Sequence, residues 1–266
     1  MQPVLRIKNL HQYFERGTVN ENHVLRGINL SLAPGEFVTI IGGNGAGKST
    51  LLNSVAGTLP IEEGQMFLNE EDITKHSVTR RSKKISRVFQ DPMLGTAGNM
   101  QIEENMLLAL RRGKQMGLSW AFKENERELF KQQLARLDLG LENRLSSSMG
   151  LLSGGQRQSI TLLMATMLKL EVLLLDEHTA ALDPKTAEKV LQLTDELVKE
   201  HHLTTLMITH NMRDALRFGN RLIMMDNGKV IYDVRGEEKS SLTVQDLLER
   251  FEVASKNTLS DRMMLG

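Results

Sequence analysis

The hydrophobic and polar positions along the chain predict a series of short strands separated by helices and turns. Residues 4–10 and 24–32 alternate apolar and polar side chains, which is typical of half-buried antiparallel strands. Apolar runs are typical of more deeply buried strands, which we expect over residues 36–41, 65–69, 85–89, 172–176, 204–209, 221–226 and 229–233. Asn227 and Gly228 join the last two runs and predict a hairpin.

Apolar residues at helical spacing predict helices over residues 51–56, 102–112, 122–137, 156–168 and 186–199. Because strands and helices alternate after residue 165, the pattern predicts the βαβ units of a mostly parallel sheet. The segment from about residue 93 to 165 is punctuated by glycines and lacks predicted strands, so we expect a helical insert within an α/β domain. Trp120, which lies in this insert, is expected to pack in a core.

Composition narrows the possible functions. The 266 residues are 40% hydrophobic and 25% charged, which is typical of a globular protein with a substantial core. Lys plus Arg equals Asp plus Glu at 33 each, so no net charge draws the chain to nucleic acid, and we expect no nucleic-acid partner. The basic segment 75–84 is expected to be a solvated surface. The absence of cysteine excludes disulfides, thiolate metal sites and a cysteine nucleophile.

Hydropathy gives no sign of a membrane segment. The apolar runs are far shorter than the roughly 18 residues of a membrane helix. The N-terminus shows no signal-peptide pattern. We therefore expect any membrane role to come through a partner.

The candidate chemistry begins with the run Gly42-Gly43-Asn44-Gly45-Ala46-Gly47-Lys48-Ser49-Thr50, which fits the phosphate-binding pattern G-x-x-x-x-G-K-[ST]. The run lies between a predicted buried strand and a predicted helix, which is the context that the pattern requires. Its glycines let backbone N–H groups curl round phosphate oxygens, Lys48 can reach the terminal phosphates, and the Ser49 hydroxyl can ligate magnesium. This loop predicts a nucleoside triphosphate site.

Two further motifs supply groups that act on phosphate. The apolar run 172–175 ends in Asp176 and Glu177, at the strand end where open parallel sheets place their ligand sites. Asp176 is suited to hold magnesium, directly or through water, and Glu177 to act as general base for an attacking water. About twenty residues upstream, Leu152 precedes Ser153-Gly154-Gly155-Gln156 at a predicted helix start, a combination suited to holding anions.

In this order, the motifs resemble those of the ATP-binding cassette ATPases, the nucleotide-binding subunits of ABC transporters, over residues 4–250. The resemblance implies one ABC ATPase domain over 1–266, of the α/β class with a P-loop NTPase core. Within it, residues 1–90 and 166–250 would form a RecA-like core plus an N-terminal antiparallel β subdomain. Residues 91–165 would form a helical subdomain insert, and 251–266 a tail.

The resemblance also assigns roles to single residues. Gly42 to Thr50 corresponds to the Walker A loop, Ser153 to Gln156 to the family signature, and Asp176 to the Walker B aspartate. By the same resemblance, Glu177 is the catalytic glutamate and His210 the switch histidine. Gln90 is the glutamine that contacts magnesium or the attacking water, and Asp183 belongs to the loop that crosses the dimer interface. The aromatic residue that stacks on adenine is expected at Phe14, with Tyr13 as the second choice.

Cassettes of this family face each other head to tail, so that the Walker A loop of one and the signature of the other enclose each ATP. The resemblance therefore implies ATP and Mg²⁺ as cofactors and a second ATP-binding subunit as partner, in a homodimer. It also implies separate transmembrane permease subunits, an extracytoplasmic substrate-binding protein, and a peripheral location on the cytoplasmic face of the cell membrane. Gln90 and the surface formed by about 91–110 would transmit the closure of the dimer on ATP and its opening after hydrolysis.

The transported substrate is a weaker inference from the sequence. Residues 99–110 and 176–184 are similar to those of bacterial tryptophan/tyrosine-type amino-acid importer ATPases, which favours an amino-acid importer. The alternatives are an exporter ATPase and a soluble, non-transport ABC ATPase such as the iron–sulfur assembly type. The family commonly has proline after the catalytic glutamate, and this chain has His178, which we expect to be a structural histidine.

Overall fold

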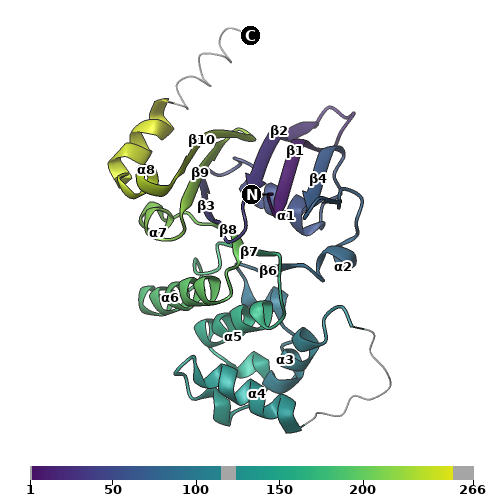
Figure 1. Ribbon diagram of the computed structural model, residues 1–266, viewed down its shortest axis with the longest axis vertical. Helices are drawn as coiled ribbons and strands as arrows, with labels where there is room; N and C mark the ends of the chain where they lie inside the picture. Colours follow the sequence, from purple (N-terminus) through teal and green to yellow (C-terminus); the bar gives the residue numbers. More distant parts are fainter. Residues whose placement is uncertain (1, 115–123, 254–266) are drawn as a thin grey trace. The chain divides into compact units, whose positions relative to one another are not determined.

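The computed structural model describes residues 2–114 and 124–253, and the chain divides into two compact units. Unit 1 consists of residues 1–77 and 204–266, and unit 2 of residues 78–203. Figure 1 shows the elements of both units in sequence colours. Each unit is described below by itself.

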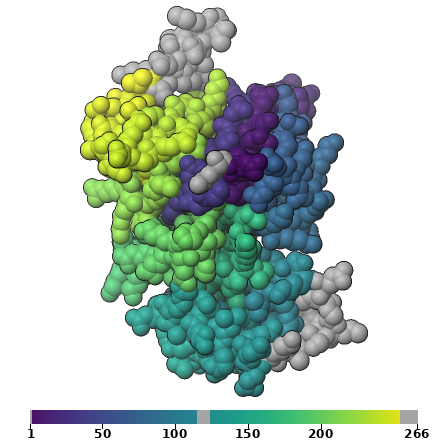
Figure 2. Space-filling model, viewed as in Figure 1, coloured from purple at the N-terminus to yellow at the C-terminus, as the bar shows by residue number. Residues whose placement is uncertain are grey.

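Unit 1 begins with an antiparallel sheet of strand order β2-β1-β4-β5. Its strands are β1 (Leu5–Phe14), β2 (Asn22–Leu32), β4 (Glu63–Leu68) and β5 (Glu71–Asp72). Leu5 lies opposite Leu32 on one side and Leu68 on the other, and all three are buried. Alternation of buried and exposed residues along β1 and β2 gives this sheet one apolar face. In Figure 2 its purple and blue residues adjoin one another on the surface of unit 1.

The second set of strands in unit 1 contains β3 (Phe37–Gly42), β8 (Thr204–Ile208), β9 (Arg221–Asp226) and β10 (Lys229–Arg235). β3 pairs in parallel with both β8 and β9, and β10 pairs antiparallel with β9. The helices of this unit are α1 (Lys48–Ala56), α7 (Met212–Arg217) and α8 (Gly236–Ser240), followed by a helical segment at 244–253. β3 is flanked by strands on both edges, which explains why its sequence is an apolar run and not an alternation.

Unit 2 contains two parallel strands, β6 (Ile85–Val88) and β7 (Val172–Asp176). Its helices are α2 (Val78–Arg81), α3 (Ile102–Leu110), α4 (Glu124–Ala135), α5 (Gly154–Thr166) and α6 (Pro184–Glu200), with short 3₁₀ turns η1 (Pro92–Gly95), η2 (Leu141–Asn143) and η3 (Met149–Leu151). α5 packs against β6, η1, α3 and α6, and α4 packs against α3 and η2. Phe130 of α4 and Ile160 of α5 are fully buried, so the helical part has its own apolar core.

The mixed α/β class is confirmed, with an antiparallel sheet near the N-terminus, parallel strands, and helices between β6 and β7. The structure starts α5 at Gly154, two residues before the predicted start at 156, because Ser153 caps this helix. The basic segment 75–84 is not wholly a solvated surface, because Arg81 is only 3% exposed. Trp120 lies outside the described residues, and the assignment of 1–266 to one ABC ATPase domain stays a prediction. Among the described residues, no helix is long and apolar enough to cross a membrane.

Candidate active site

The predicted phosphate loop lies in unit 1, between the end of β3 and the start of α1. The Lys48 side chain, which is 5% exposed, turns back over the loop and donates to the carbonyl oxygens of Gly42 at 2.8 Å and Gly43 at 3.0 Å. Asn44, Gly45 and Ser49 are exposed. No side chain caps α1, so its positive end faces this loop. A helix start with these features is suited to binding an anion.

Two glycines of the loop are required by its geometry. Gly47 has φ 93°, and a Cβ there would lie 2.8 Å from the Leu25 side chain. A Cβ on Gly42 would lie 2.3 Å from the carbonyl oxygen of Met225 in β9. Neither position can accept a side chain without displacing its neighbours. The amide of Gly228 donates to the Ala46 oxygen at 3.2 Å, so the β9–β10 turn holds the loop from the other side.

Both candidates for the adenine-stacking residue lie at the end of β1, in unit 1. Tyr13 is already stacked on His23, with ring centroids 4.1 Å apart, and the Arg16 guanidinium lies 4.3 Å from the Tyr13 ring centroid. Phe14 is 40% exposed. An exposed aromatic face is free to accept a base, whereas the face of Tyr13 is engaged. The geometry favours Phe14 over Tyr13.

His210 follows β8 in unit 1 and is exposed. The next residue, Asn211, caps α7 by accepting hydrogen bonds from the amides of Arg213 at 2.9 Å and Asp214 at 3.4 Å. This cap fixes the backbone directly after His210, at the carboxyl end of a parallel strand.

The predicted acidic pair lies in unit 2, at the end of β7. Asp176 forms an ion pair with Arg87 of β6, with Nη2 and Oδ2 2.5 Å apart. Glu177 has φ 48°, a left-handed conformation that non-glycine residues rarely adopt. Backbone strain of this kind occurs at functional sites, where the surrounding structure fixes the direction of a side chain. Gln90 lies beyond the end of the neighbouring strand β6 and is exposed.

His178 turns into the interior of unit 2. It is 2% exposed, and its Nε2 lies 3.0 Å from the Thr194 hydroxyl of α6. Burial lowers the pKa of His178 to about 4, so the ring is neutral at pH 7. The geometry agrees with a structural role for this histidine.

The predicted signature forms the start of α5. Ser153 accepts a hydrogen bond from the Gln156 amide at 3.3 Å, and the Gln156 side chain accepts one from the Ser153 amide at 3.1 Å. This reciprocal capping box begins the helix at Gly154. Ser153 and Gly154 are exposed, whereas Gly155 is buried against Thr186 of α6.

Asp183 caps α6 and lies three residues before Thr186, the residue that Gly155 contacts. Its carboxylate accepts from the Thr186 amide at 3.1 Å, and hydrogen bonds from the side chain and amide of Thr186 lower the pKa of the Asp183 carboxyl. A Cβ on Gly155 would lie 2.0 Å from the Thr186 side chain. The starts of α5 and α6 are therefore in direct contact.

The predicted site residues divide between the two units. Unit 1 carries the loop from Gly42 to Thr50, Phe14 and His210. Unit 2 carries the other predicted groups: Gln90, Ser153, Gly154, Gly155, Gln156, Asp176, Glu177 and Asp183. Within unit 2, the structure brings the signature together with the start of α6, and Asp176 together with Arg87.

The predicted metal ligands fit magnesium by their chemistry. Ser49, Gln90 and Asp176 offer a hydroxyl, an amide and a single carboxylate, all of them oxygen ligands. Among the described residues, no group of three or more His, Cys, Asp or Glu side chains could hold a metal ion. Magnesium is commonly bound by one or two carboxylates together with water and substrate phosphates, so a single carboxylate is enough.

Sequence reasoning missed two side chains of unit 2. Arg87 is the one charged residue of β6, and a charged side chain within a short strand is the sequence feature that could have pointed to it. Gln158 is fully buried on α5 and donates to the Phe89 carbonyl oxygen at 3.0 Å, which anchors the residue before Gln90. Its position, two residues after the signature, carried no comparable signal.

Comparison with known proteins identifies relatives along nearly the whole chain. A family model described as ABC transporter matches residues 25–180. The chain is 45% identical over 94% of its length, and 100% of the relative, to a tyrosine transport ATP-binding protein of Clostridioides difficile (strain R20291). It is 36% identical to the thiamine import ATP-binding protein ThiQ of Yersinia pestis, over 82% of this chain and 88% of the relative.

A solved structure agrees with these sequence matches. It is a dimeric ATP-binding cassette in a post-hydrolysis state bound to ADP and Pi, with a TM-score of 0.74 and 29% identity. The match covers 87% of this chain and 98% of the solved chain.

Proposed function

This chain belongs to the ABC transporter family of ATPases, and from that membership we propose that it dimerises on ATP and drives solute import through separate membrane permease subunits. The family resemblance deduced from the sequence is confirmed, and so is the enzyme class. The relatives include a thiamine import ATP-binding protein, which favours an importer over an exporter or a soluble ABC ATPase.

The single observation that carries the dimer proposal is the presence of two helix starts suited to phosphate. The loop at Gly42 to Thr50 opens α1 in unit 1, and Ser153 opens α5 in unit 2. One nucleotide needs one phosphate loop, so the second helix start is available to a nucleotide on another copy. The dimeric solved relative supports this arrangement. We infer a head-to-tail homodimer in which each ATP is enclosed by both copies.

We infer the following roles for the chain's own residues in hydrolysis. The loop amides and Lys48 bind the phosphates, and Phe14 stacks on the adenine. Glu177, whose backbone is in the left-handed conformation, orients and deprotonates the attacking water. His210 hydrogen-bonds the γ-phosphate, and Asp183 contacts the partner copy across the interface.

Magnesium, held by Ser49, Gln90 and Asp176, would supply charge stabilisation to the phosphates. The rest of the catalysis that we infer is the positioning of the phosphates and the water and the stabilisation of charge. Hydrogen-bonded groups such as those of the phosphate loop and of the helix starts are suited to both.

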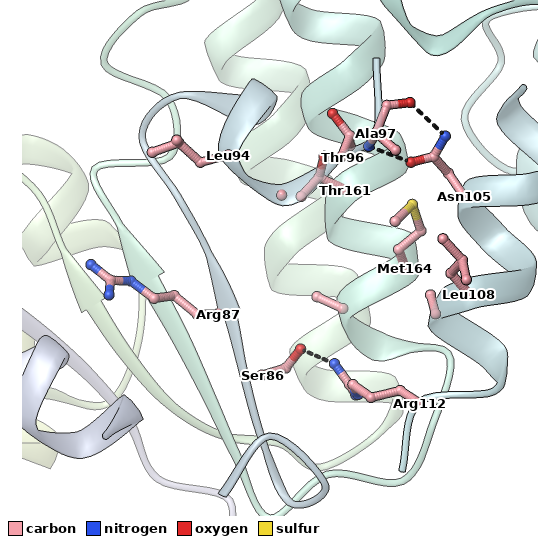
Figure 3. A pocket seen from close by; sticks show the side chains of 13 residues that line it. Ser86, Arg87, Leu94, Thr96, Ala97, Asn105, Leu108, Arg112, Thr161 and Met164 are labelled. Carbon is pink, nitrogen blue, oxygen red and sulfur yellow. Dashed lines mark hydrogen bonds between the residues drawn. The ribbon is translucent and has the colours of Figure 1, made fainter. Parts of the chain in front are cut away.

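A pocket in unit 2 offers a surface for the permease. It lies between β6, η1, α3 and α5 and has a volume of about 490 Å³ (Figure 3). Leu94 and Leu108 line it while remaining 69% and 37% exposed, which is unusual for large apolar side chains unless a partner covers them. Arg112 donates to Ser86 at 2.6 Å, while its Nε and Nη2 are buried without a hydrogen-bond partner.

A buried guanidinium that is only partly hydrogen-bonded favours a partner segment that brings a carboxylate together with apolar side chains. We infer that such a permease segment docks in this pocket, which would place the chain at the cytoplasmic face of the membrane.

The cargo is proposed from the most similar relative reported above, the tyrosine transport ATP-binding protein. We propose an aromatic amino acid, delivered by an extracytoplasmic substrate-binding protein. The test is uptake of labelled tyrosine by cells with and without an intact gene for this chain. Loss of uptake that is restored by the wild-type chain and not by Glu177→Gln supports the assignment. Unchanged tyrosine uptake would contradict the cargo and leave the ATPase proposal standing.

The dimer proposal has its own test, which is a mixing experiment. Lys48→Ala should disable the phosphate loop and Ser153→Arg the signature, so that each variant alone lacks ATPase activity. In a mixed dimer both defects fall in one site and leave the other site intact. ATPase activity should therefore reappear when the two inactive variants are mixed. No recovery, with both variants folded and able to form mixed dimers, would argue against a site completed by the partner copy.

A further inference from the structure

In the ion pair between Arg87 and Asp176, a positively charged guanidinium lies against the carboxylate that is proposed to hold magnesium. The two side chains are 12% and 13% exposed, so the pair is largely withdrawn from water. Electrostatic interactions are stronger in such surroundings than at an exposed surface. The negative charge of the Asp176 carboxylate is thus already compensated by Arg87 when no metal ion is bound.

The backbone holds this pair in register. Strands β6 and β7 are parallel neighbours, with Arg87 opposite Leu174, which lies two residues before Asp176 on β7. The Arg87 guanidinium also lies 4.7 Å from the centroid of the Phe89 ring. Figure 3 shows Arg87 extending away from Arg112, whose guanidinium contacts the Ser86 hydroxyl. The two arginines at this pocket therefore serve different contacts.

We propose that Arg87 competes with magnesium for Asp176. This inference rests on the proposed nucleotide function, because Asp176 is a metal ligand only if the chain binds a magnesium–nucleotide complex. A guanidinium and a divalent cation at one carboxylate repel each other, since both carry positive charge at short range. Arg87 neutralises Asp176 in the nucleotide-free subunit and withdraws from it when the magnesium–nucleotide complex binds. The ion pair thereby raises the magnesium concentration that tight nucleotide binding requires.

Arg87 also lines the pocket that is proposed for the permease. One side chain thus reaches from the docking surface to the metal ligand. A partner that draws the guanidinium into the pocket would free Asp176 for the metal.

The test measures nucleotide binding and not turnover. Fluorescently labelled ADP is held at a fixed concentration with the purified full-length chain while Mg²⁺ is titrated, and anisotropy reports the bound fraction. Arg87→Met keeps the length and apolar character of the stem and removes the charge. The Mg²⁺ concentration for half-maximal binding should fall by at least about fivefold in this variant. Arg87→Lys keeps the charge but loses the planar group over Phe89, so its Mg²⁺ requirement should lie between those of Arg87→Met and the wild type.

Arg136→Met is the matched control, because it removes an arginine that pairs with Glu200 on α6 and has no contact with Asp176. It should leave the Mg²⁺ requirement unchanged. Arg87→Gln also removes the charge and is measured alongside, so that the proposal can still be tested if Arg87→Met does not fold. Circular dichroism checks the fold of each variant.

An unchanged or higher Mg²⁺ requirement in folded Arg87→Met and Arg87→Gln would overturn the competition. If the wild type bound no ADP at any Mg²⁺ concentration, the nucleotide function itself would fail. These two failures are therefore distinguishable.

Discussion

Acidification should destabilise this protein through one buried side chain, His178. The ring is 2% exposed, and its Nε2 lies 3.0 Å from the Thr194 hydroxyl. Burial lowers its pKa from 6.5 to about 4. Below about pH 6.5, His178 is protonated in the unfolded chain, whereas in the folded chain it stays neutral down to about pH 4. Protonation therefore favours the unfolded state, and stability falls as the pH falls through this window.

The size of the effect follows from the two pKa values. The full difference of roughly 2.5 units corresponds to about 3 kcal/mol, reached only below the folded pKa of about 4. Between about pH 7.5 and about pH 5, linkage gives a loss of roughly 2 kcal/mol. Above the unfolded pKa the histidine is neutral in both states and contributes no pH dependence.

Urea unfolding of the wild type and His178→Gln at the two pH values, without nucleotide or magnesium, measures this contribution. Glutamine can still hydrogen-bond the Thr194 hydroxyl and does not titrate. The variant should lose about 2 kcal/mol less than the wild type over the same pH interval, because the other titrating groups are common to both proteins. Equal pH dependence in the two proteins would refute the reasoning, whatever their absolute stabilities.

Three further predictions concern the site. Glu177→Gln should retain ATP binding, lose hydrolysis by at least about a hundredfold and accumulate as a dimer on size-exclusion chromatography; turnover like that of the wild type would exclude the general-base role. Phe14→Ala should weaken binding of labelled ATP by about tenfold and Tyr13→Ala by much less, and the reverse order would move the adenine to Tyr13. Gly155→Ala should reduce ATPase activity, because its Cβ would lie 2.0 Å from the Thr186 Cγ2. Adding Thr186→Ser, which removes that methyl group, should restore activity, and failure of this rescue would place the defect elsewhere.

The local backbone structure of the candidate site was predictable from the sequence. The Gly42 to Thr50 loop lies between β3 and α1 as expected, because the glycine spacing and the flanking apolar run specify a strand, a turn and a helix within about fifteen residues. The Ser153 cap belongs to the same class, since its partner Gln156 is three residues away. Both are short-range patterns that one sequence can carry.

Contacts between distant residues were not predictable in this way. Arg87 and Asp176 are 89 positions apart, and their ion pair depends on the parallel pairing of β6 with β7. The preference for Phe14 over Tyr13 as the proposed adenine-stacking residue likewise rests on the stacking of Tyr13 on His23, which follows from the register of β1 against β2. Arg81 shows the same limit, because a run of basic residues gives no sign of which one is buried.

The helix α5 connects several of these features through rigid packing. At its start, Gly155 touches Thr186 beside the Asp183 cap; one turn on, the buried Gln158 holds the Phe89 carbonyl oxygen before Gln90. Further along the same helix, other side chains line the pocket proposed for the permease. A close-packed helix moves as a body and does not deform smoothly. A partner that displaced α5 from this pocket would therefore shift the signature, the start of α6 and the residue before Gln90 together, so that this helix would link the proposed docking to the proposed hydrolysis.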